Sequence, residues 1–152
     1  MNKIASFCVD HTKLYPGVYI SRIDGDVTTY DLRFKKPNSN DFLENATLHT
    51  IEHIFATLCR NSEYSKYIIY FGPMGCRTGF YFLVRNMNEE DVLNLIVSTF
   101  KKISEFIGEI PGNSEVECGN YLEHDLEGAR KESEKFYNVI KSWDSSKMIY
   151  KN

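Results

Sequence analysis

Alternation of apolar and polar positions marks four short segments of the chain as β-strands. The segments GVYISRI and VTTYDLRF flank Asp24, Gly25 and Asp26, a composition that is typical of a hairpin turn. Further along, KYIIYF and GFYFLVR form two more apolar and aromatic runs, which the short loop GPMGCRT connects. The sequence therefore predicts two pairs of strands.

Helical periodicity predicts three longer elements, over residues 45–60, 88–107 and 125–143. Each begins at a residue that can cap a helix: Asn45 or Thr47, Asn88, and Asp125. Because strand pairs and helices are segregated along the chain rather than alternating, a βαβ nucleotide fold is disfavoured. We expect an α+β fold in which an antiparallel sheet has its helices packed mainly on one face.

Length and charge narrow the class of protein. The chain has 152 residues without repeats, low-complexity tracts or linkers, so we expect a single domain over residues 1–152. Its net charge of -3 and scattered lysines provide no basic stripe for nucleic acid. Without an apolar export signal or an apolar stretch that could span a bilayer, we expect no membrane partner and a cytoplasmic location.

The first predicted helix carries polar side chains within the apolar sequence LHTIEHIFATLCRN. His49 and His53 are four residues apart, so they share one helical face and can bind one metal ion, while Glu52 projects from the neighbouring row. One histidine alone is more often a satisfied core residue. The H-x-x-E-H spacing reverses that preference, because inverted zincins use it to hold zinc beside a general base. A catalytic site of this type needs a third protein ligand.

Cys118 is the best candidate for that third ligand. Gly119 would let the backbone approach closely, and the irregular segment around it can bend a thiolate back toward the helix. Taken alone, Cys118 is equally well explained as a small buried residue. His124 is a rival ligand, but its position directly before a capped helix favours an orienting or packing role.

The other cysteines differ in their settings. In the absence of an export signal, cysteines are better explained as thiols or metal ligands than as disulfides. Cys76 lies between Gly75 and Arg77 on a loop, where flexible backbone, partial exposure and positive charge favour a reactive thiolate. We expect Cys8 and Cys59 to be ordinary buried thiols.

These motifs occur together in one known family. The segments LHTIEHIFA, GPMGCRTGFY, ECG and HDLEGAR, with SFCVDHTKL and YDLRFKKPN, closely resemble the S-ribosylhomocysteine lyases, the LuxS proteins. The resemblance extends from Ser6 to about Arg130. It departs from the family at Tyr70 and Gly72, where an aspartate and a serine are common, and at Lys35, where a cysteine is frequent.

The resemblance implies an activity and a role for each candidate residue. The implied enzyme is a carbon-sulfur lyase that converts S-ribosylhomocysteine to homocysteine and 4,5-dihydroxy-2,3-pentanedione, the autoinducer-2 precursor. It works as a homodimer with pockets between the chains and holds one divalent metal per subunit, natively iron(II), which zinc or cobalt can replace. The implied metal ligands are His49, His53 and Cys118, the acid/base pair is Glu52 and Cys76, and the substrate pocket includes Ser6, His11 and Arg33.

Without the family, other interpretations stay open. Arg33 would be expected on a solvated strand face, and Ser6 and His11 would form a turn and a surface imidazole at a mobile terminus. One alternative function is an inverted metallopeptidase in which Glu52 activates a metal-bound water, although that class usually has a carboxylate ligand and a much longer chain. Another is a catalytically silent binding module with a closed structural metal site, in which His124 would be the fourth ligand.

Overall fold

The computed structural model describes residues 1–151 and joins the two predicted strand pairs into one four-stranded sheet. The strands are β1 (Gly17–Asp24), β2 (Val27–Arg33), β3 (Ile68–Pro73) and β4 (Gly79–Arg85). All neighbouring strands are antiparallel and their order is β1-β2-β4-β3, so β2 and β4 pair in the centre of the sheet. The predicted antiparallel sheet is confirmed.

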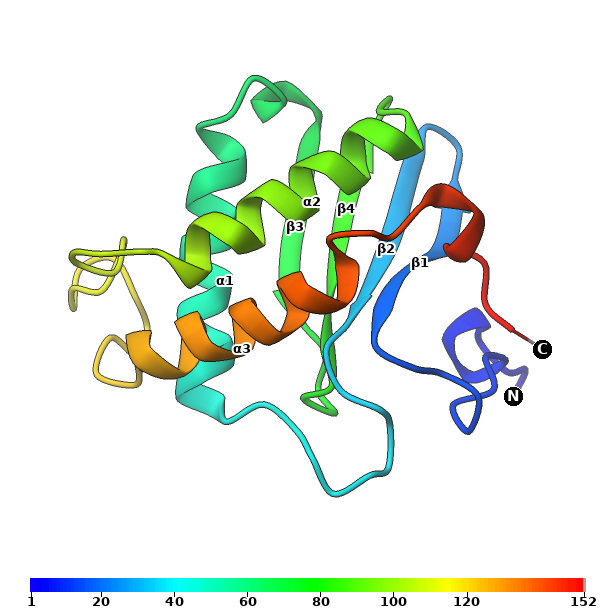
Figure 1. Cartoon of the computed structure of the whole chain (residues 1–152), viewed down its shortest axis with the longest axis horizontal. Coiled ribbons are helices and arrows are strands. Elements are labelled where there is room, and N and C mark those ends of the chain that lie inside the picture. The colour runs from blue at the N-terminus through cyan, green and yellow to red at the C-terminus, as the bar shows by residue number, and fades with distance from the viewer. Residues whose placement is uncertain (152) are drawn as a thin grey trace.

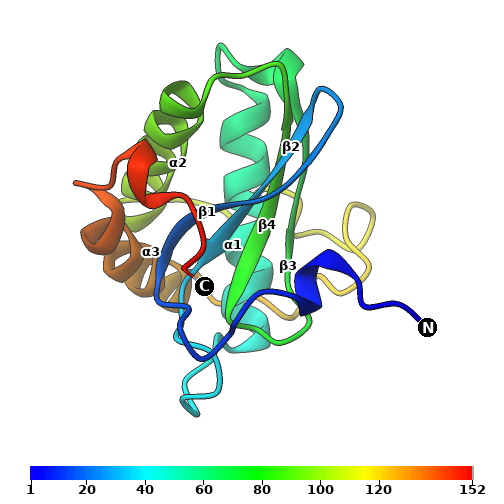
Figure 2. The ribbon, with the colours of Figure 1, turned by 90° about the vertical axis from the view of Figure 1, so that its right-hand side faces the viewer.

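Three α-helices cover one face of this sheet (Figure 1). They are α1 (Asn45–Arg60), α2 (Glu89–Ser104) and α3 (Leu126–Ile140). Figure 2 shows the helices on one side of the sheet and the N-terminal segment on the other, which confirms the α+β arrangement. Short 3-10 helices occur at η1 (Ala5–Phe7), η2 (Ser65–Tyr67) and η3 (Ser145–Lys147). Within residues 1–151, no helix combines the length and the apolar character needed to cross a membrane.

Two of the three predicted helix caps are confirmed. The side chain of Asn88 accepts a hydrogen bond from the backbone of Asp91, and that of Asp125 accepts one from Gly128. These helices end at residues 104 and 140, before the predicted 107 and 143.

The predicted cap of α1 is wrong. Glu44 occupies the cap position without a side-chain hydrogen bond, and Asn45 is already helical. Thr47 lies inside the helix, is buried, and donates a hydrogen bond to the carboxylate of Asp125 at 3.3 Å. Its hydroxyl therefore joins α1 to the start of α3 instead of capping α1.

The hydrophobic core lies between the sheet and the helices and is rich in phenylalanine. Phe80 and Phe82 of β4 belong to this core, Phe82 packs against Phe55 of α1, and each of these rings is fully buried. Because side chains alternate along a strand, the residues between them point to the opposite face of the sheet. This alternation places Asp31 and Arg33 of β2 on the face away from the helices.

A close backbone approach in the centre of the sheet yields a stability prediction. A Cβ at Gly79 would collide with the carbonyl oxygen of Leu32 in the paired strand. Because backbone in a central ladder cannot move aside as a side chain can, Gly79→Ala should destabilise the fold by about 1–3 kcal/mol. Gly75→Ala is a matched control, since a Cβ there would meet nothing within 4 Å. Urea unfolding midpoints measure both variants, and equal midpoints would contradict the close approach.

Candidate metal centre and thiol cleft

The two histidines of α1 are held in a defined orientation by carbonyl groups of the segment between α2 and α3. Nδ1 of His49 lies 2.7 Å from the carbonyl oxygen of Glu123. Nδ1 of His53 lies 2.8 Å from the carbonyl oxygen of Pro111. A carbonyl oxygen can only accept, so in the neutral rings each Nδ1 carries the hydrogen and each Nε2 keeps a free lone pair. Metal-binding histidines have this arrangement when they coordinate through Nε2.

Both Nε2 atoms face the sulfur of Cys118. The Sγ atom lies 3.4 Å from Nε2 of His49 and 3.8 Å from Nε2 of His53. A tetrahedral ion with bonds of about 2.1 Å to nitrogen and about 2.3 Å to sulfur would separate these atoms by roughly 3.6 Å. The spacing of the three donor atoms therefore fits one bound metal ion.

The loop that carries Cys118 turns its sulfur toward α1. The backbone N–H of Cys118 donates to the carbonyl of Ser114 at 3.0 Å, and the N–H of Asn120 donates to Sγ at 3.4 Å. The close approach expected at Gly119 is wrong, because a Cβ there would meet nothing within 4 Å. The backbone N–H of Asn120 thus helps to fix the position of the sulfur.

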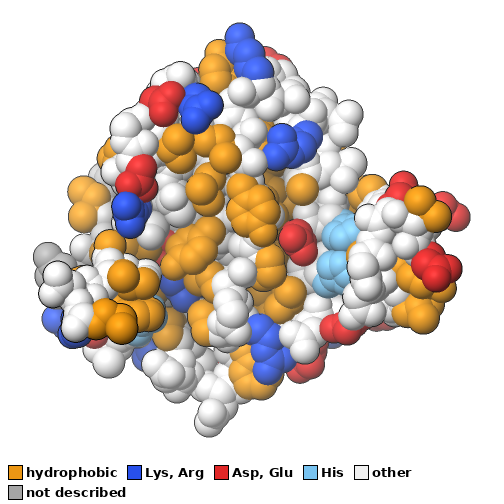
Figure 3. All heavy atoms as spheres, turned by 180° about the vertical axis from the view of Figure 1, so that it is seen from behind, with side chains coloured by type: hydrophobic (Ala, Val, Ile, Leu, Met, Phe, Trp, Pro, Cys, Tyr) orange, Lys and Arg blue, Asp and Glu red, His pale blue; other side chains and the backbone are white. Residues whose placement is uncertain are grey.

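The close approach occurs instead at Gly112, which directly follows the carbonyl that orients His53. Gly112 has φ +70°, and a Cβ on it would lie 3.2 Å from Nδ1 of His53. The loop can thus pass close to the imidazole only with a glycine at this position. In Figure 3, histidine side chains are visible at the surface beside the lobe formed by the segment between α2 and α3.

His124 joins the same cluster. Its donor atom and those of His49, His53 and Cys118 all lie within 4.8 Å of one another, so the cluster fits a metal site. The Thr50 hydroxyl donates to a carbonyl at 2.9 Å and therefore accepts from Nδ1 of His124, also at 2.9 Å. Burial, with the nearby His49 and His53, lowers the pKa of His124 to about 4. Its Nε2 is buried without a hydrogen-bond partner among residues 1–151, so a fourth lone pair is available.

Ring geometry separates His124 from the other three candidates. A metal ion lies close to the plane of each imidazole that binds it, because the nitrogen lone pair lies in that plane. The rings of His49 and His124 are stacked, with centroids 4.0 Å apart and planes at 19°, so these planes do not meet near the cluster. The rings of His49 and His53 are at 89°, so their planes intersect, and both Nε2 atoms face the same sulfur. The stacking opposes binding of one ion by His49 and His124 together, and the contacts of Cys118 Sγ with Nε2 of His49 and His53 favour these three residues as the ligands.

Cys76 lies apart from these contacts, in a cleft at the loop between β3 and β4. The thiol is exposed, as predicted for a loop position. The cleft has a volume of ≈ 310 Å³ and is lined by His11, Cys76, Thr78 and residues 37–42. No hydrogen bond or ion pair within residues 1–151 joins Cys76 to the metal cluster.

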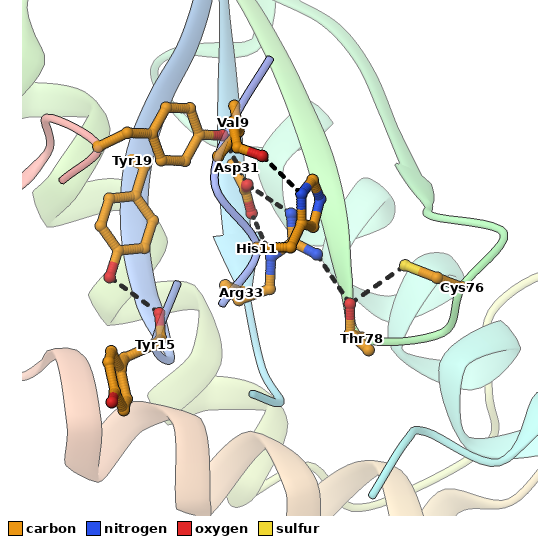
Figure 4. A network of polar contacts seen from close by, with 9 residues as sticks. Val9, His11, Tyr15, Tyr19, Asp31, Arg33, Cys76 and Thr78 are labelled. Atoms are coloured by element: carbon orange, nitrogen blue, oxygen red, sulfur yellow. Dashed lines mark hydrogen bonds and ion pairs between the residues drawn. The ribbon is translucent and has the colours of Figure 1, made fainter. Parts of the chain in front are cut away.

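Arg33 reaches this cleft through one hydroxyl group (Figure 4). Its Nη1 donates to Thr78 Oγ1 at 2.8 Å, and the same oxygen lies 3.1 Å from the sulfur of Cys76. Arg33 is only 3% exposed, so a solvated strand face, the expectation without the family, is wrong. Burial acts to lower the pKa of Arg33, but the Asp31 carboxylate more than compensates and the pKa is raised. The guanidinium therefore stays charged.

The N-terminal candidates take different positions. His11 is half-buried, lines the cleft, and places its Nδ1 2.9 Å from the carbonyl of Val9 (Figure 4). Ser6 is half-buried in η1 and is not among the lining residues. Within the chain, the structure thus groups His11 and Arg33 around Cys76, while Ser6 lies outside this group.

Cys8 and Cys59, both predicted to be buried thiols, differ in their exposure. Cys59 is fully buried, and burial raises its pKa to about 12, so it is unreactive. Cys8 is exposed, which contradicts the prediction of a buried thiol. The residue follows η1 in an N-terminal segment that buries none of its η1 residues, and its position in an apolar sequence context was misleading.

Lys35 replaces a frequent family cysteine with a buried, paired cation. Its Nζ lies 2.9 Å from a carboxylate oxygen of Glu132 in α3 and 3.3 Å from one of Asp41. Lys35 is 7% exposed, and two carboxylates are what make such burial tolerable. Asp41 also lines the cleft of Cys76, so Lys35 connects the end of β2 and the cleft loop to α3.

The other two departures from the family accommodate each other. A Cβ at Gly72 would lie 2.5 Å from the hydroxyl oxygen of Tyr70 and 2.6 Å from its ring. The Tyr70 ring therefore covers the glycine and occupies the space of a serine side chain. The large side chain of Tyr70 is therefore accommodated by the absence of a side chain at Gly72.

Comparisons with known proteins give the same family as the motifs. The family model described as S-Ribosylhomocysteinase (LuxS) matches residues 4–147. The S-ribosylhomocysteine lyase of Borreliella afzelii is 48% identical over 156 residues, 99% of each chain. Proteins of the same name from Finegoldia magna and Clostridium beijerinckii are 47% and 42% identical, over 99% and 100% of each chain. This chain belongs to the S-ribosylhomocysteinase (LuxS) family.

Proposed function

We infer that the protein is an S-ribosylhomocysteine lyase, a carbon-sulfur lyase that releases homocysteine and 4,5-dihydroxy-2,3-pentanedione. One observation carries this inference: a chain of the LuxS family presents two Nε2 lone pairs and one sulfur at the spacing of a single metal ion. Relatives named for the lyase match the chain over nearly its full length, which supports the same activity.

The alternative functions are less well supported. A metallopeptidase of the inverted type would be expected to bring a carboxylate into the metal cluster, but the cluster consists of histidines and one cysteine. A closed structural site would need His124 as the fourth ligand, and the stacking of its ring on His49 opposes that role. An open coordination position suits a lyase.

The reaction requires the sugar carbonyl to move before sulfur can leave. Homocysteine sulfur is attached to the fifth carbon of the ribose, and its departure needs an acidic hydrogen on the fourth carbon, hence a carbonyl at the third. When bound, a divalent metal polarises neighbouring sugar oxygens and lets the carbonyl migrate from the first carbon to the third. The residues His49, His53 and Cys118 would hold it.

Proton transfer is assigned to Cys76 and Glu52. Each removes a proton from one sugar carbon and returns it to a neighbouring atom during carbonyl migration. In the last step, a base takes the proton from the fourth carbon. The electron pair of the broken carbon-hydrogen bond forms the double bond to the fifth carbon, and the carbon-sulfur bond breaks. Homocysteine leaves as the thiolate. Glu52 is half-buried next to His53 on α1, and the exposed Cys76 thiol faces the cleft.

The substrate pocket is proposed to include Ser6, His11 and Arg33. His11 lines the cleft beside Cys76, which supports its role directly. Arg33 is buried behind Thr78, so its contribution is to fix that hydroxyl and supply positive charge. The role of Ser6 rests on the family resemblance.

We also propose that the active protein is a homodimer with pockets between its chains. Large apolar side chains are exposed at Phe7 (69%), Tyr70 (55%) and Leu122 (81%). Figure 3 shows hydrophobic side chains across the sheet face opposite the helices, the kind of surface that a second copy can cover.

A cytoplasmic location is proposed from the four free cysteines, which suit a reducing compartment.

Metal content tests the proposed ligand set. Cys118→Ala should lose most of its metal, because two histidines hold the ion too weakly. His124→Ala should keep its metal if the fourth position is open, and Cys8→Ser serves as a cysteine control outside the cluster. Elemental analysis of purified proteins gives the stoichiometry. Full occupancy in Cys118→Ala would reject that ligand, and metal loss in His124→Ala would favour the closed structural site.

The identity of the metal as iron(II) is proposed from the family resemblance. Ferrous iron with an open position is redox-active, so the iron-loaded enzyme should lose activity in air. Zinc is not redox-active, and reconstitution with zinc or cobalt should restore activity. Activity followed over hours of oxygen exposure makes the comparison. An iron-loaded enzyme that is unaffected by prolonged oxygen would count against an exposed iron site.

The role of Cys76 can be separated from that of the metal ligands. Cys76→Ala should retain the metal and bind substrate, because Cys76 makes no contact with the cluster among residues 1–151. Its release of homocysteine should fall by at least roughly a hundredfold, the scale of a general acid/base contribution. Incubation with S-ribosylhomocysteine and titration of free thiol measure the rate. Release at the parent rate would remove Cys76 from the mechanism, and absence of release from the parent protein would overturn the proposed function.

A further inference from the structure

A buried ion pair lies on the sheet face opposite the helices, next to the thiol cleft. Arg33 Nε and Nη2 donate to the two carboxylate oxygens of Asp31 at 3.1 and 2.6 Å. Asp31 is 1% exposed and Arg33 is 3% exposed. A buried pair of charges is tolerated only when its remaining donors and acceptors are satisfied as well. Each end of this pair therefore needs a further partner.

At the arginine end, the partner is the hydroxyl next to Cys76. Thr78 Oγ1 accepts from Arg33 Nη1 at 2.8 Å, which leaves its own hydrogen free. The Cys76 sulfur lies 3.1 Å away, so the hydroxyl can donate to it when the thiol is ionised. Figure 4 shows this succession, with Arg33 between Asp31 and Thr78. The position of Arg33 thus decides whether the thiolate receives a donor.

At the carboxylate end, the partner comes from the C-terminal tail. The hydroxyl of Tyr150 donates to Asp31 Oδ2 at 2.6 Å. Burial, with the nearby Asp31 charge, raises the pKa of Tyr150, so this hydroxyl stays protonated and remains a donor. The tail is held at the edge of β1, where Met148 is fully buried and its carbonyl accepts from Ile20 at 2.7 Å. The family match ends at residue 147, so this contact lies beyond it.

We propose that the Tyr150 hydroxyl positions the Cys76 thiol, acting through the buried ion pair between them. Without this donor, the carboxylate of Asp31 can turn away from its two-point contact, and Arg33 can follow it away from Thr78. This inference rests on the proposed function in one respect: the proposed function gives Cys76 its proton-carrying role.

Tyr150→Phe tests the hydroxyl alone, since the phenyl ring can keep its stack on Tyr19, with centroids 5.2 Å apart. Alkylation of Cys76 by iodoacetamide, followed by mass spectrometry of its peptide between pH 5 and 9, reports the thiolate without requiring lyase activity. We expect the variant to alkylate about threefold to tenfold more slowly near neutral pH, the effect of one lost hydrogen bond. The kcat for homocysteine release should fall by a similar factor at unchanged metal content.

Tyr19→Phe is the matched control. It belongs to the same aromatic stack, but its hydroxyl donates to the carbonyl of Tyr15 at 2.8 Å and not to Asp31. Its alkylation profile should equal that of the parent. An equal shift in both variants would show that loosening of the stack, not the hydroxyl bond to Asp31, is responsible, and would overturn the proposal.

Other titratable groups near Cys76 are unchanged in these variants. They are His11 and Asp41 in the cleft, Arg33 of β2 and Tyr81 of β4. Their contributions cancel when parent and variant profiles are compared at the same pH, so a difference between the profiles reports the hydroxyl.

A double-mutant cycle locates the path. Thr78→Val removes the donor next to Cys76, and in that background Tyr150→Phe should have no further effect on alkylation. Additive effects, or an unchanged profile in Tyr150→Phe itself, would overturn the proposal. If the parent protein releases no homocysteine, the proposed function fails while the alkylation comparison still tests the position of the thiol.

Discussion

The packing of α1 against the aromatic layer of the sheet is the constraint on which the metal centre depends. Ile51, Ile54 and Phe55 are fully buried on one face of this helix. Their burial fixes the rotation of α1 about its axis, and helical spacing then sets the direction of His49 and His53. A helix free to rotate could not keep two Nε2 atoms within 4 Å of one sulfur. The apolar half of α1 thus determines the geometry of the polar half.

A helix supplies two donors, but the third must come from a segment whose backbone is irregular. In regular helices and strands the backbone N–H and carbonyl groups form hydrogen bonds with one another. In the segment between α2 and α3, the carbonyls of Pro111 and Glu123 instead orient the imidazoles. The same segment brings Cys118 to the open side of the histidines. Its lack of regular structure is therefore what allows one segment to provide a ligand and to select the tautomers of two others.

The sequence predicted the elements well because their signals are local. Period-two and helical patterns identified four strands and three helices, and Asn88 and Asp125 revealed two helix starts. The order of the strands was not predicted, because pairing of β2 with β4 depends on distant contacts. The cap of α1 was missed for a similar reason, since Thr47 bonds to Asp125, which is remote in sequence.

The metal ligands could be predicted from the sequence where they lie close together along the chain. The positions of His49 and His53 follow from one helical turn, whereas the choice of Cys118 over His124 came from the irregular segment around Cys118 and from the position of His124 directly before a capped helix. The stacking of His124 on His49, which opposes binding of one ion by both rings, depends on ring planes that a sequence does not contain. Thr50 was missed altogether, although its hydroxyl fixes the tautomer of His124.

Burial of charge explains why the thiol cleft was harder to foresee. Arg33 and Asp31 are two apart on one strand, a spacing that places both on one face and could have suggested an ion pair. Nothing local indicated that this face is covered, because the tail residue Tyr150 that contacts it is more than a hundred positions away. Once both charges are buried, their geometry is strict, since each lost contact leaves an unsatisfied ion. Thr78 contacts both Arg33 of this pair and the Cys76 thiol. The surroundings of the thiol are therefore more rigid than its position on an exposed loop would suggest.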